Sequence, residues 1–381
     1  MGIADMDKGD DKGAGLPDQK PGTAGEAAVT GAVDFFASDG ARLYLVSPGG
    51  LALMQAAGDT AAGWRQIAPQ PPGFVPVAAK GADGVLLLWS AAGEAWLFAA
   101  ESGFQPCILP SGQRVRAGVV AQAGACLLIG PDEGPLRAVL ATRDLATPWR
   151  DLPALPTLAE PADTAPALFA TADRLWLASC GDRDGVEGFS LWSLDLAAET
   201  AVWDLRLPRG AGRSAMNFRI SALCGIDDGS TLIATLPALA RPLSGLDHPG
   251  SELIVLPPDG GWDLVIGEAR FSPEGLKIPF SLIGEGFESP DSSWITALAV
   301  SGGAIVALCR DPLGVEPPVL RLCRDAAALA DWEILHSGDL PALIASAAVD
   351  PASAGLFAVG SGLAMTQGAS VRLIAGPAQL R

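Results

Sequence analysis

Short apolar runs of strand length, separated by turn residues, recur along this chain from residue 33 onward. The clearest example lies between Ser293 and His336, which hold four runs: Trp294–Val300, Ala304–Cys309, Val319–Cys323 and Trp332–His336. Each run is rich in Val, Ile, Leu and aromatic residues, as β-strands are, and Gly-Gly, Asp-Pro or polar stretches bound it. Four antiparallel strands of this size form one twisted sheet, which is the unit of a β-propeller blade.

The same rhythm of four strands can be assigned seven times along the chain. It predicts an all-β fold, a β-propeller of seven four-stranded antiparallel blades spanning residues 31–381. The expected blades cover 33–67, 74–109, 115–152, 167–207, 218–266, 294–336 and 345–375. In the last blade, Ala345–Val349 is expected to be the first strand and Val371–Ala375 the fourth. Residues 1–30 contain almost no large apolar side chain, so we expect them to form a disordered N-terminal tail.

The fourth strand of five expected blades begins with tryptophan and then alternates between apolar and polar residues. These tryptophans are Trp64, Trp149, Trp203, Trp262 and Trp332. Alternation of this kind is typical of an outer strand that is buried on one face and solvated on the other. We interpret the tryptophans as packing between blades; the alternative is an aromatic platform for a sugar.

The composition excludes several classes of partner. The formal net charge is −18, and binding of nucleic acid requires clustered Lys and Arg, so we expect neither nucleic acid nor an anionic membrane surface as a partner. No apolar run approaches the roughly 20 residues that span a bilayer, and no secretory signal is visible, which predicts a cytoplasmic protein. The six cysteines are far apart in sequence, without a C-x-x-C pair, and are interpreted as buried small hydrophobic residues.

The repeat pattern resembles the degenerate propeller repeats of the BNR/sialidase-like and kelch-like kind. The stretch Asp259-Gly260-Gly261-Trp262 is similar to the end of an Asp-box turn, although no complete Ser-x-Asp-x-Gly-x-x-Trp box is present. The resemblance implies a propeller fold. The enzymes of these groups would need a tyrosine nucleophile with an arginine cluster, or several Tyr and His ligands for copper. The chain has one tyrosine, Tyr44, and two histidines, so we expect neither chemistry, no metal site and no cofactor.

Long connections provide the remaining functional signal. Five of them (181–188, 208–217, 237–250, 267–292 and 310–318) are expected on one face of the propeller, where binding usually resides. They carry several of the chain's few cationic side chains and one histidine, and the candidate binding residues are Arg209, Arg213, Arg241, His248 and Arg270. The leading hypothesis is a non-catalytic scaffold that docks a protein partner on this face. The alternative is an enzyme or lectin-like module that binds a small anionic or carbohydrate ligand at the central depression.

Overall fold

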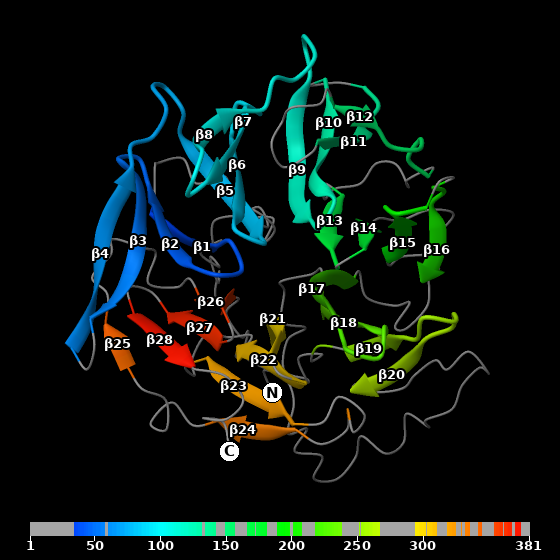
Figure 1. Ribbon diagram of the computed structural model, residues 1–381. Helices are drawn as coiled ribbons and strands as arrows, with labels where there is room; N and C mark the ends of the chain where they lie inside the picture. The colour runs from blue at the N-terminus through cyan, green and yellow to red at the C-terminus, as the bar shows by residue number, and fades with distance from the viewer. Residues whose placement is uncertain are drawn as a thin grey trace, which may run out of the picture.

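The computed structural model describes most of the strand-forming part of the chain. The described residues are 34–57, 60–131, 134–141, 149–156, 166–171, 173–180, 189–198, 201–207, 218–237, 251, 253–266, 294–301, 303–310, 318–324, 329, 332–335, 342–344, 354–360, 362–367 and 370–374. They form seven four-stranded antiparallel sheets arranged as blades around a common centre, as Figure 1 shows. The predicted all-β, seven-bladed propeller is therefore confirmed. The expected tail, residues 1–30, lies outside the described residues.

Six blades follow the chain in order from the centre outward. Blade one contains β1 (Phe35–Ser38), β2 (Leu43–Ser47), β3 (Gly50–Ala57) and β4 (Thr60–Ala68). Blade two contains β5 (Pro76–Ala82), β6 (Val85–Ser90), β7 (Ala95–Ala99) and β8 (Gly103–Pro106). Blade three contains β9 (Arg114–Ala121), β10 (Gly124–Gly130), β11 (Arg137–Ala141) and β12 (Arg150–Asp151). Blade four contains β13 (Ala167–Ala170), β14 (Arg174–Cys180), β15 (Phe189–Asp195) and β16 (Asp204–Leu207).

Blades five and six repeat this arrangement, and each strand pairs with the next one along the chain. Blade five contains β17 (Phe218–Gly225), β18 (Thr231–Pro237), β19 (Leu253–Leu256) and β20 (Asp263–Ile266). Blade six contains β21 (Trp294–Ser301), β22 (Ala304–Arg310), β23 (Val319–Cys323) and β24 (Glu333–Leu335).

Blade seven differs from the sequence-based prediction in its strand order. Its strands are β25 (Ala342–Ile344), β26 (Ala354–Val359), β27 (Gly362–Gln367) and β28 (Ser370–Ile374), in the sheet order β25-β28-β27-β26. The innermost strand is β26, and the outermost strand, β25, comes from upstream and pairs with β28. The prediction of Val371–Ala375 as the fourth strand is wrong, because β25 already occupies the outer edge. The expected first strand, Ala345–Val349, lies outside the described residues.

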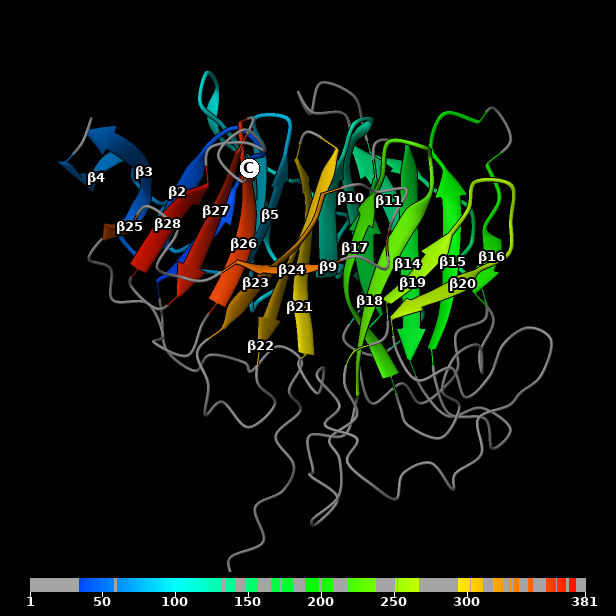
Figure 2. The same cartoon turned by 90° about the horizontal axis from the view of Figure 1, so that it is seen from below.

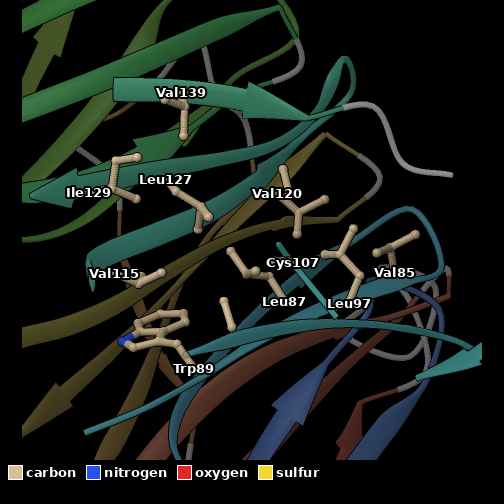
Figure 3. Packing of buried hydrophobic residues seen from close by; sticks show 12 residues of the cluster. Val85, Leu87, Trp89, Leu97, Cys107, Val115, Val120, Leu127, Ile129 and Val139 are labelled. Atoms are coloured by element: carbon tan, nitrogen blue, oxygen red, sulfur yellow. The ribbon is translucent and has the colours of Figure 1, made fainter. Parts of the chain in front are cut away.

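The core consists of seven apolar layers, one between each pair of neighbouring blades. The second strand of each blade lies inside its sheet and is buried on both faces, so its side chains alternate between two layers. In β6, Leu86 and Leu88 face blade one, whereas Leu87 and Trp89 face blade three. Figure 3 shows the layer between blades two and three, where Leu87 points toward side chains of blade three. This two-sided burial explains the continuous apolar runs of the second strands.

The five tryptophans of the outer strands pack against these layers, which confirms the interpretation made from sequence. Trp149, Trp203, Trp262 and Trp332 each contact the layer shared with the preceding blade. Trp64 follows the same rule at the junction of blades seven and one, where it stacks on Phe36 at a ring distance of 5.6 Å. In blade two, the equivalent residue is Phe104.

A hydrogen-bonded loop, Ser38–Tyr44, connects the last, first and second blades, and we call it the closing loop. The buried Asp39 carboxylate accepts hydrogen bonds from the amides of Ala41 (2.9 Å) and Arg42 (2.7 Å) and from the Tyr44 hydroxyl (2.6 Å). The Ser38 hydroxyl donates to the Ala358 carbonyl of blade seven. Two further backbone bonds run from Gly360 N to Gly40 O (2.9 Å) and from Gly84 N to Asp39 O (2.8 Å).

The same local arrangement occurs in blade four with different side chains. There, the Trp176 indole N–H donates to the Thr171 hydroxyl over 3.1 Å, and Thr171 N bonds Arg174 O, as Asp39 N bonds Arg42 O. In both blades, an aromatic residue of the second strand is held by a polar residue five positions earlier.

Candidate functional site: the loop-bearing face

The antiparallel order of the blades defines two faces with different connections. Turns between second and third strands and crossovers between blades lie on one face, which we call the loop-bearing face. The strands that flank all five long connections end there: β14 and β15, β16 and β17, β18 and β19, β20 and β21, and β22 and β23. The described strand ends therefore share this face, whereas the connections between them lie outside the described residues; Figure 2 shows these blades edge-on.

The candidate binding residues themselves are not placed by the structure. Arg209, Arg213, Arg241, His248 and Arg270 all lie outside the described residues, so their mutual distances stay predictions. The face is instead described mainly over blades one to three, where its turns are short.

Charged residues are distributed very unevenly between the described turns of the two faces. Among the described turns and crossovers of the loop-bearing face, Glu94 is the single charged residue. The described turns of the opposite face contain nine: Asp39, Arg42, Asp83, Glu101, Asp173, Asp227, Asp228, Asp259 and Arg324. For these described turns, desolvation by a partner would cost less on the loop-bearing face than on the opposite face.

Three of the five exposed large apolar side chains in the described residues lie on the loop-bearing face of blade two: Val75, Val77 and Ile108. Phe74 anchors the crossover before β5 by packing on Trp96, at a ring distance of 5.9 Å, and Val75 beside it faces solvent. After β8, Cys107 is buried and its amide bonds Ala95 O over 2.9 Å, which leaves Ile108 80% exposed.

The turns of this face are tied to one another, so the surface is held in one arrangement. The Gln70 amide donates to the Ser47 carbonyl over 3.1 Å, which joins the crossover after blade one to that blade's own turn. The Val115 amide donates to Gly93 O over 2.9 Å, which joins the turn of blade two to β9. At Gly93, φ is +80° and an added Cβ would lie 2.3 Å from the Arg114 Cβ, so this close approach requires glycine.

The inner wall of the ring is predominantly apolar in the described residues. Half-buried side chains on the innermost strands are mainly Ala, Val, Leu and Phe, among them Val119, Phe169, Leu298 and Phe357. Charged side chains described there are Lys80, Arg114 and Arg116. The Arg116 guanidinium donates to the Pro131 carbonyl over 2.6 Å and so serves the adjacent turn.

The tyrosine and two of the described cysteines are buried, and their pKa values are raised. Tyr44 is buried in the layer between blades one and two, and burial, followed by its bond to Asp39, raises the pKa of its hydroxyl. Burial also raises the pKa of the Cys107 and Cys126 thiols to about 12. A sialidase-like role for Tyr44 is incompatible with this packing. The interpretation of the cysteines as buried small residues is confirmed for Cys107, Cys126, Cys309 and Cys323.

The described residues contain no group of three or more His, Cys, Asp and Glu side chains placed to hold a metal ion. Within the same part of the chain, no helix has the length and apolar character needed to cross a membrane.

Sequence reasoning did not identify the exposed apolar residues of blade two on this face. The signal was available in Pro71-Pro72-Gly73-Phe74-Val75-Pro76-Val77 and Pro106-Cys107-Ile108-Leu109-Pro110, two crossovers without any charged residue. Large aliphatic side chains flanked by prolines on a crossover cannot all turn inward, because the extended chain directs neighbouring side chains to opposite sides.

Comparisons with known proteins give only distant structural similarities. No family model and no curated protein matches the sequence. Among solved structures, YCF48 from Cyanidioschyzon merolae is 11% identical, with a TM-score of 0.49 over 91% of this chain and 96% of its own. A streptogramin B lyase is 10% identical, with a TM-score of 0.48 over 90% and 92%. The Neurospora crassa Pan2 WD40 domain is 11% identical, with a TM-score of 0.48 over 91% and 89%. At these values, the comparisons carry no argument about this chain.

Proposed function

We propose that the protein is a non-catalytic binding scaffold that docks a protein partner on its loop-bearing face. The observation that carries this proposal is the contrast between the two faces. The loop-bearing face has Glu94 as the single charged residue in its described turns and exposes Val75, Val77 and Ile108. The centres of protein–protein interfaces are likewise depleted of charge and enriched in apolar side chains.

In this proposal, the long connections over blades four to six supply the polar contacts. Arg209, Arg213, Arg241, His248 and Arg270 would pair with acidic groups of the partner. Arginine suits this role because its guanidinium group forms paired hydrogen bonds with a carboxylate. Attraction between these groups would also accelerate association at low salt. The proposed setting is cytoplasmic.

The second candidate function, binding of a small anionic or carbohydrate ligand at the centre of the ring, has less support. Such a site requires several convergent polar groups on the inner wall. The innermost strands carry mainly alanine, aliphatic and phenylalanine residues, and of their four charged residues, Lys80, Arg114, Arg116 and Arg219, Arg116 bonds a turn carbonyl.

The test is co-purification of partners from the native host with wild-type protein and three variants, each checked for folding by far-UV circular dichroism. Val75→Lys combined with Ile108→Lys should abolish recovery of the partner. Arg213→Glu combined with Arg241→Glu should weaken its binding by roughly tenfold or more, if each lost pair contributes about 1.5–3 kcal/mol. Asp259→Lys, on the opposite face, is the control and should bind normally. Unchanged binding in both folded loop-face variants would contradict the proposal.

A further inference from the structure

The innermost strands of four blades contain a β-bulge close to the loop-bearing face. In β5, β9, β17 and β21, the pairing with the second strand shifts once near the start of the strand. A bulge leaves one residue out of the ladder and redirects its side chain. The residues left out are Val77, Arg116, Ser221 and Thr296. In blades five and six, the bulged residue therefore has a hydroxyl group.

The two hydroxyls bond equivalent carbonyls of the second strand, and one of them also reaches the next blade. The Ser221 hydroxyl lies 3.1 Å from the carbonyl oxygen of Ala234. In the same way, the Thr296 hydroxyl lies 3.3 Å from the carbonyl oxygen of Leu308. The Ser221 hydroxyl also donates to the carbonyl of Ile295, in blade six, over 2.6 Å. A hydroxyl has one proton, so the shorter distance identifies Ile295 as the principal acceptor.

A second serine of blade five bonds the amide of the same residue. The Ile295 amide donates to Ser251 Oγ over 2.7 Å, and Ser251 is 5% exposed. Both backbone polar groups of Ile295 are therefore bonded by side chains of the preceding blade. We call Ser221 and Ser251 the serine clamp.

Blades two and three show which contact the serine clamp replaces. There, the Val115 amide donates to the Gly93 carbonyl. Val115 and Ile295 are each the second residue of an innermost strand, and Gly93 and Ser251 each stand two residues before a third strand. In blade two, a tight turn brings its own carbonyl to this position. In blade five, where the connection 237–250 is long, the Ser251 side chain takes the place of that carbonyl.

The serine clamp lies where three of the long connections join the blades. Ser251 directly follows the connection 237–250, β17 follows 208–217, and β21 follows 267–292. The hydrogen bonds of the clamp therefore hold the strand ends that flank these connections in a fixed relation to one another.

We propose that Ser221 and Ser251 are positioning residues for partner docking, because they hold the starts of β17, β19 and β21 in the arrangement that the partner recognises. This inference rests on the proposed function, since it concerns the same loop-bearing face. A preorganised surface binds more tightly, because less conformational freedom is lost on association. Loss of the clamp should therefore weaken docking even where the fold persists.

Native-state hydrogen exchange tests the clamp without a partner. In Ser251→Ala, the Ile295 amide should exchange about tenfold faster or more, because its buried acceptor is gone, whereas the Val115 amide should keep its wild-type rate. Ser193→Ala is the matched control. Ser193 is also buried (1% exposed), but its hydroxyl has no bonding partner among the described residues, so its loss should leave the Ile295 amide unchanged. Wild-type exchange of the Ile295 amide in Ser251→Ala would overturn the proposal.

The dissociation constant of the partner, purified after recovery from the native host, tests the positioning role. Ser221→Ala combined with Ser251→Ala should raise it by about tenfold or more. Ser251→Thr keeps a hydroxyl acceptor and should bind as the wild type does. Tyr44→Phe removes a hydrogen bond on the opposite face, so it lowers stability without touching the clamp and should also bind normally.

The outcomes distinguish this inference from the proposed function. Wild-type binding by the double serine variant, with weaker binding by Arg213→Glu combined with Arg241→Glu, would overturn the inference alone. Equal weakening in Tyr44→Phe and the double serine variant would mean that the serines act through stability only, which also contradicts a positioning role. Recovery of no partner by the wild-type protein would overturn both.

Discussion

Removal of the Tyr44 hydroxyl from the closing loop should destabilise the protein measurably, although only one oxygen atom is lost. Tyr44→Phe keeps the ring, which lies edge-on to Phe98 at 6.0 Å, and deletes the 2.6 Å bond to Asp39. Asp39 is buried, so water cannot replace the lost donor on its second carboxylate oxygen. A hydrogen bond to a buried charged group contributes about 1.5–3 kcal/mol.

The corresponding shift in melting temperature follows from the size of the propeller. Unfolding entropies of about 2.1 cal/mol/K per residue give roughly 0.7 kcal/mol/K for a unit of this size, so Tyr44→Phe should lower the Tm by about 2–4 °C. Asp39→Asn should cost less, because its carbonyl oxygen still accepts from Ala41 and Arg42 and its amide can donate to Tyr44. Asp39→Ala removes all three bonds and should cost most, about 2–4 kcal/mol.

Calorimetry of the three variants, together with native-state hydrogen exchange, checks both the size and the place of the effect. Exchange should accelerate first at the Gly84 and Gly360 amides, because these bond carbonyls of the closing loop. A Tyr44→Phe protein with the wild-type Tm, or an Asp39→Asn protein less stable than Asp39→Ala, would refute this reasoning. A double-mutant cycle between positions 39 and 44 then gives their coupling energy.

Three further predictions concern stability. Gly81→Ala should destabilise the protein by about 2–4 kcal/mol, because the new Cβ would lie 2.3 Å from the Ser38 carbonyl oxygen. Gly118→Ala should destabilise it less, because the nearest atom there is a Leu87 methyl at 2.6 Å, which can shift. Chemical denaturation of both variants gives the ranking, and the reverse order would contradict this prediction. Alkaline pH should destabilise the protein through its buried thiols. The pKa of Cys107 and Cys126 is about 12 in the folded protein and 9.0 in the unfolded chain. The stability that is fully present below pH 9 is therefore lost as the pH rises toward 12, by about 2 kcal/mol per thiol at pH 10.5. Denaturation curves at pH 8 and 10.5 measure this, and equal midpoints would exclude it. Deletion of residues 1–30 should leave the Tm unchanged, since they carry no strand pattern, and a fall of several degrees would mean that they supply packing.

Local patterns were sufficient to predict six blades because each is built from consecutive strands. The apolar second strands and the Trp-initiated fourth strands are visible in sequence, since two-sided burial and one-sided burial impose different alternation. Blade seven was mispredicted for a physical reason. The sequence of Ala342-Leu343-Ile344 does not indicate whether this strand lies at the inner or the outer edge of the sheet. Because β26 occupies the inner edge, between β21 and β1, the triplet pairs with β28 at the outer edge.

The closing loop was overlooked, although the chain contains a trace of it. Arg42-Leu43-Tyr44-Leu45 and Arg174-Leu175-Trp176-Leu177 are near copies, and Asp39 and Thr171 stand three residues before each arginine. Comparison of blades one and four would have suggested a polar residue bonded to an aromatic one. The candidate arginines and His248 remain predictions of sequence, because long connections have no periodicity from which distances follow.

The origin of β25 has a consequence for how the ring is made during synthesis. Every described sheet, including the seventh, is assembled from one continuous stretch of chain, and no strand near the N-terminus waits to complete the last sheet. Each blade can therefore form its hairpins soon after it leaves the ribosome, with loop closures between neighbours in sequence. The one long-range step is the docking of blade seven on blade one, where Ser38 and Gly40 meet Ala358 and Gly360.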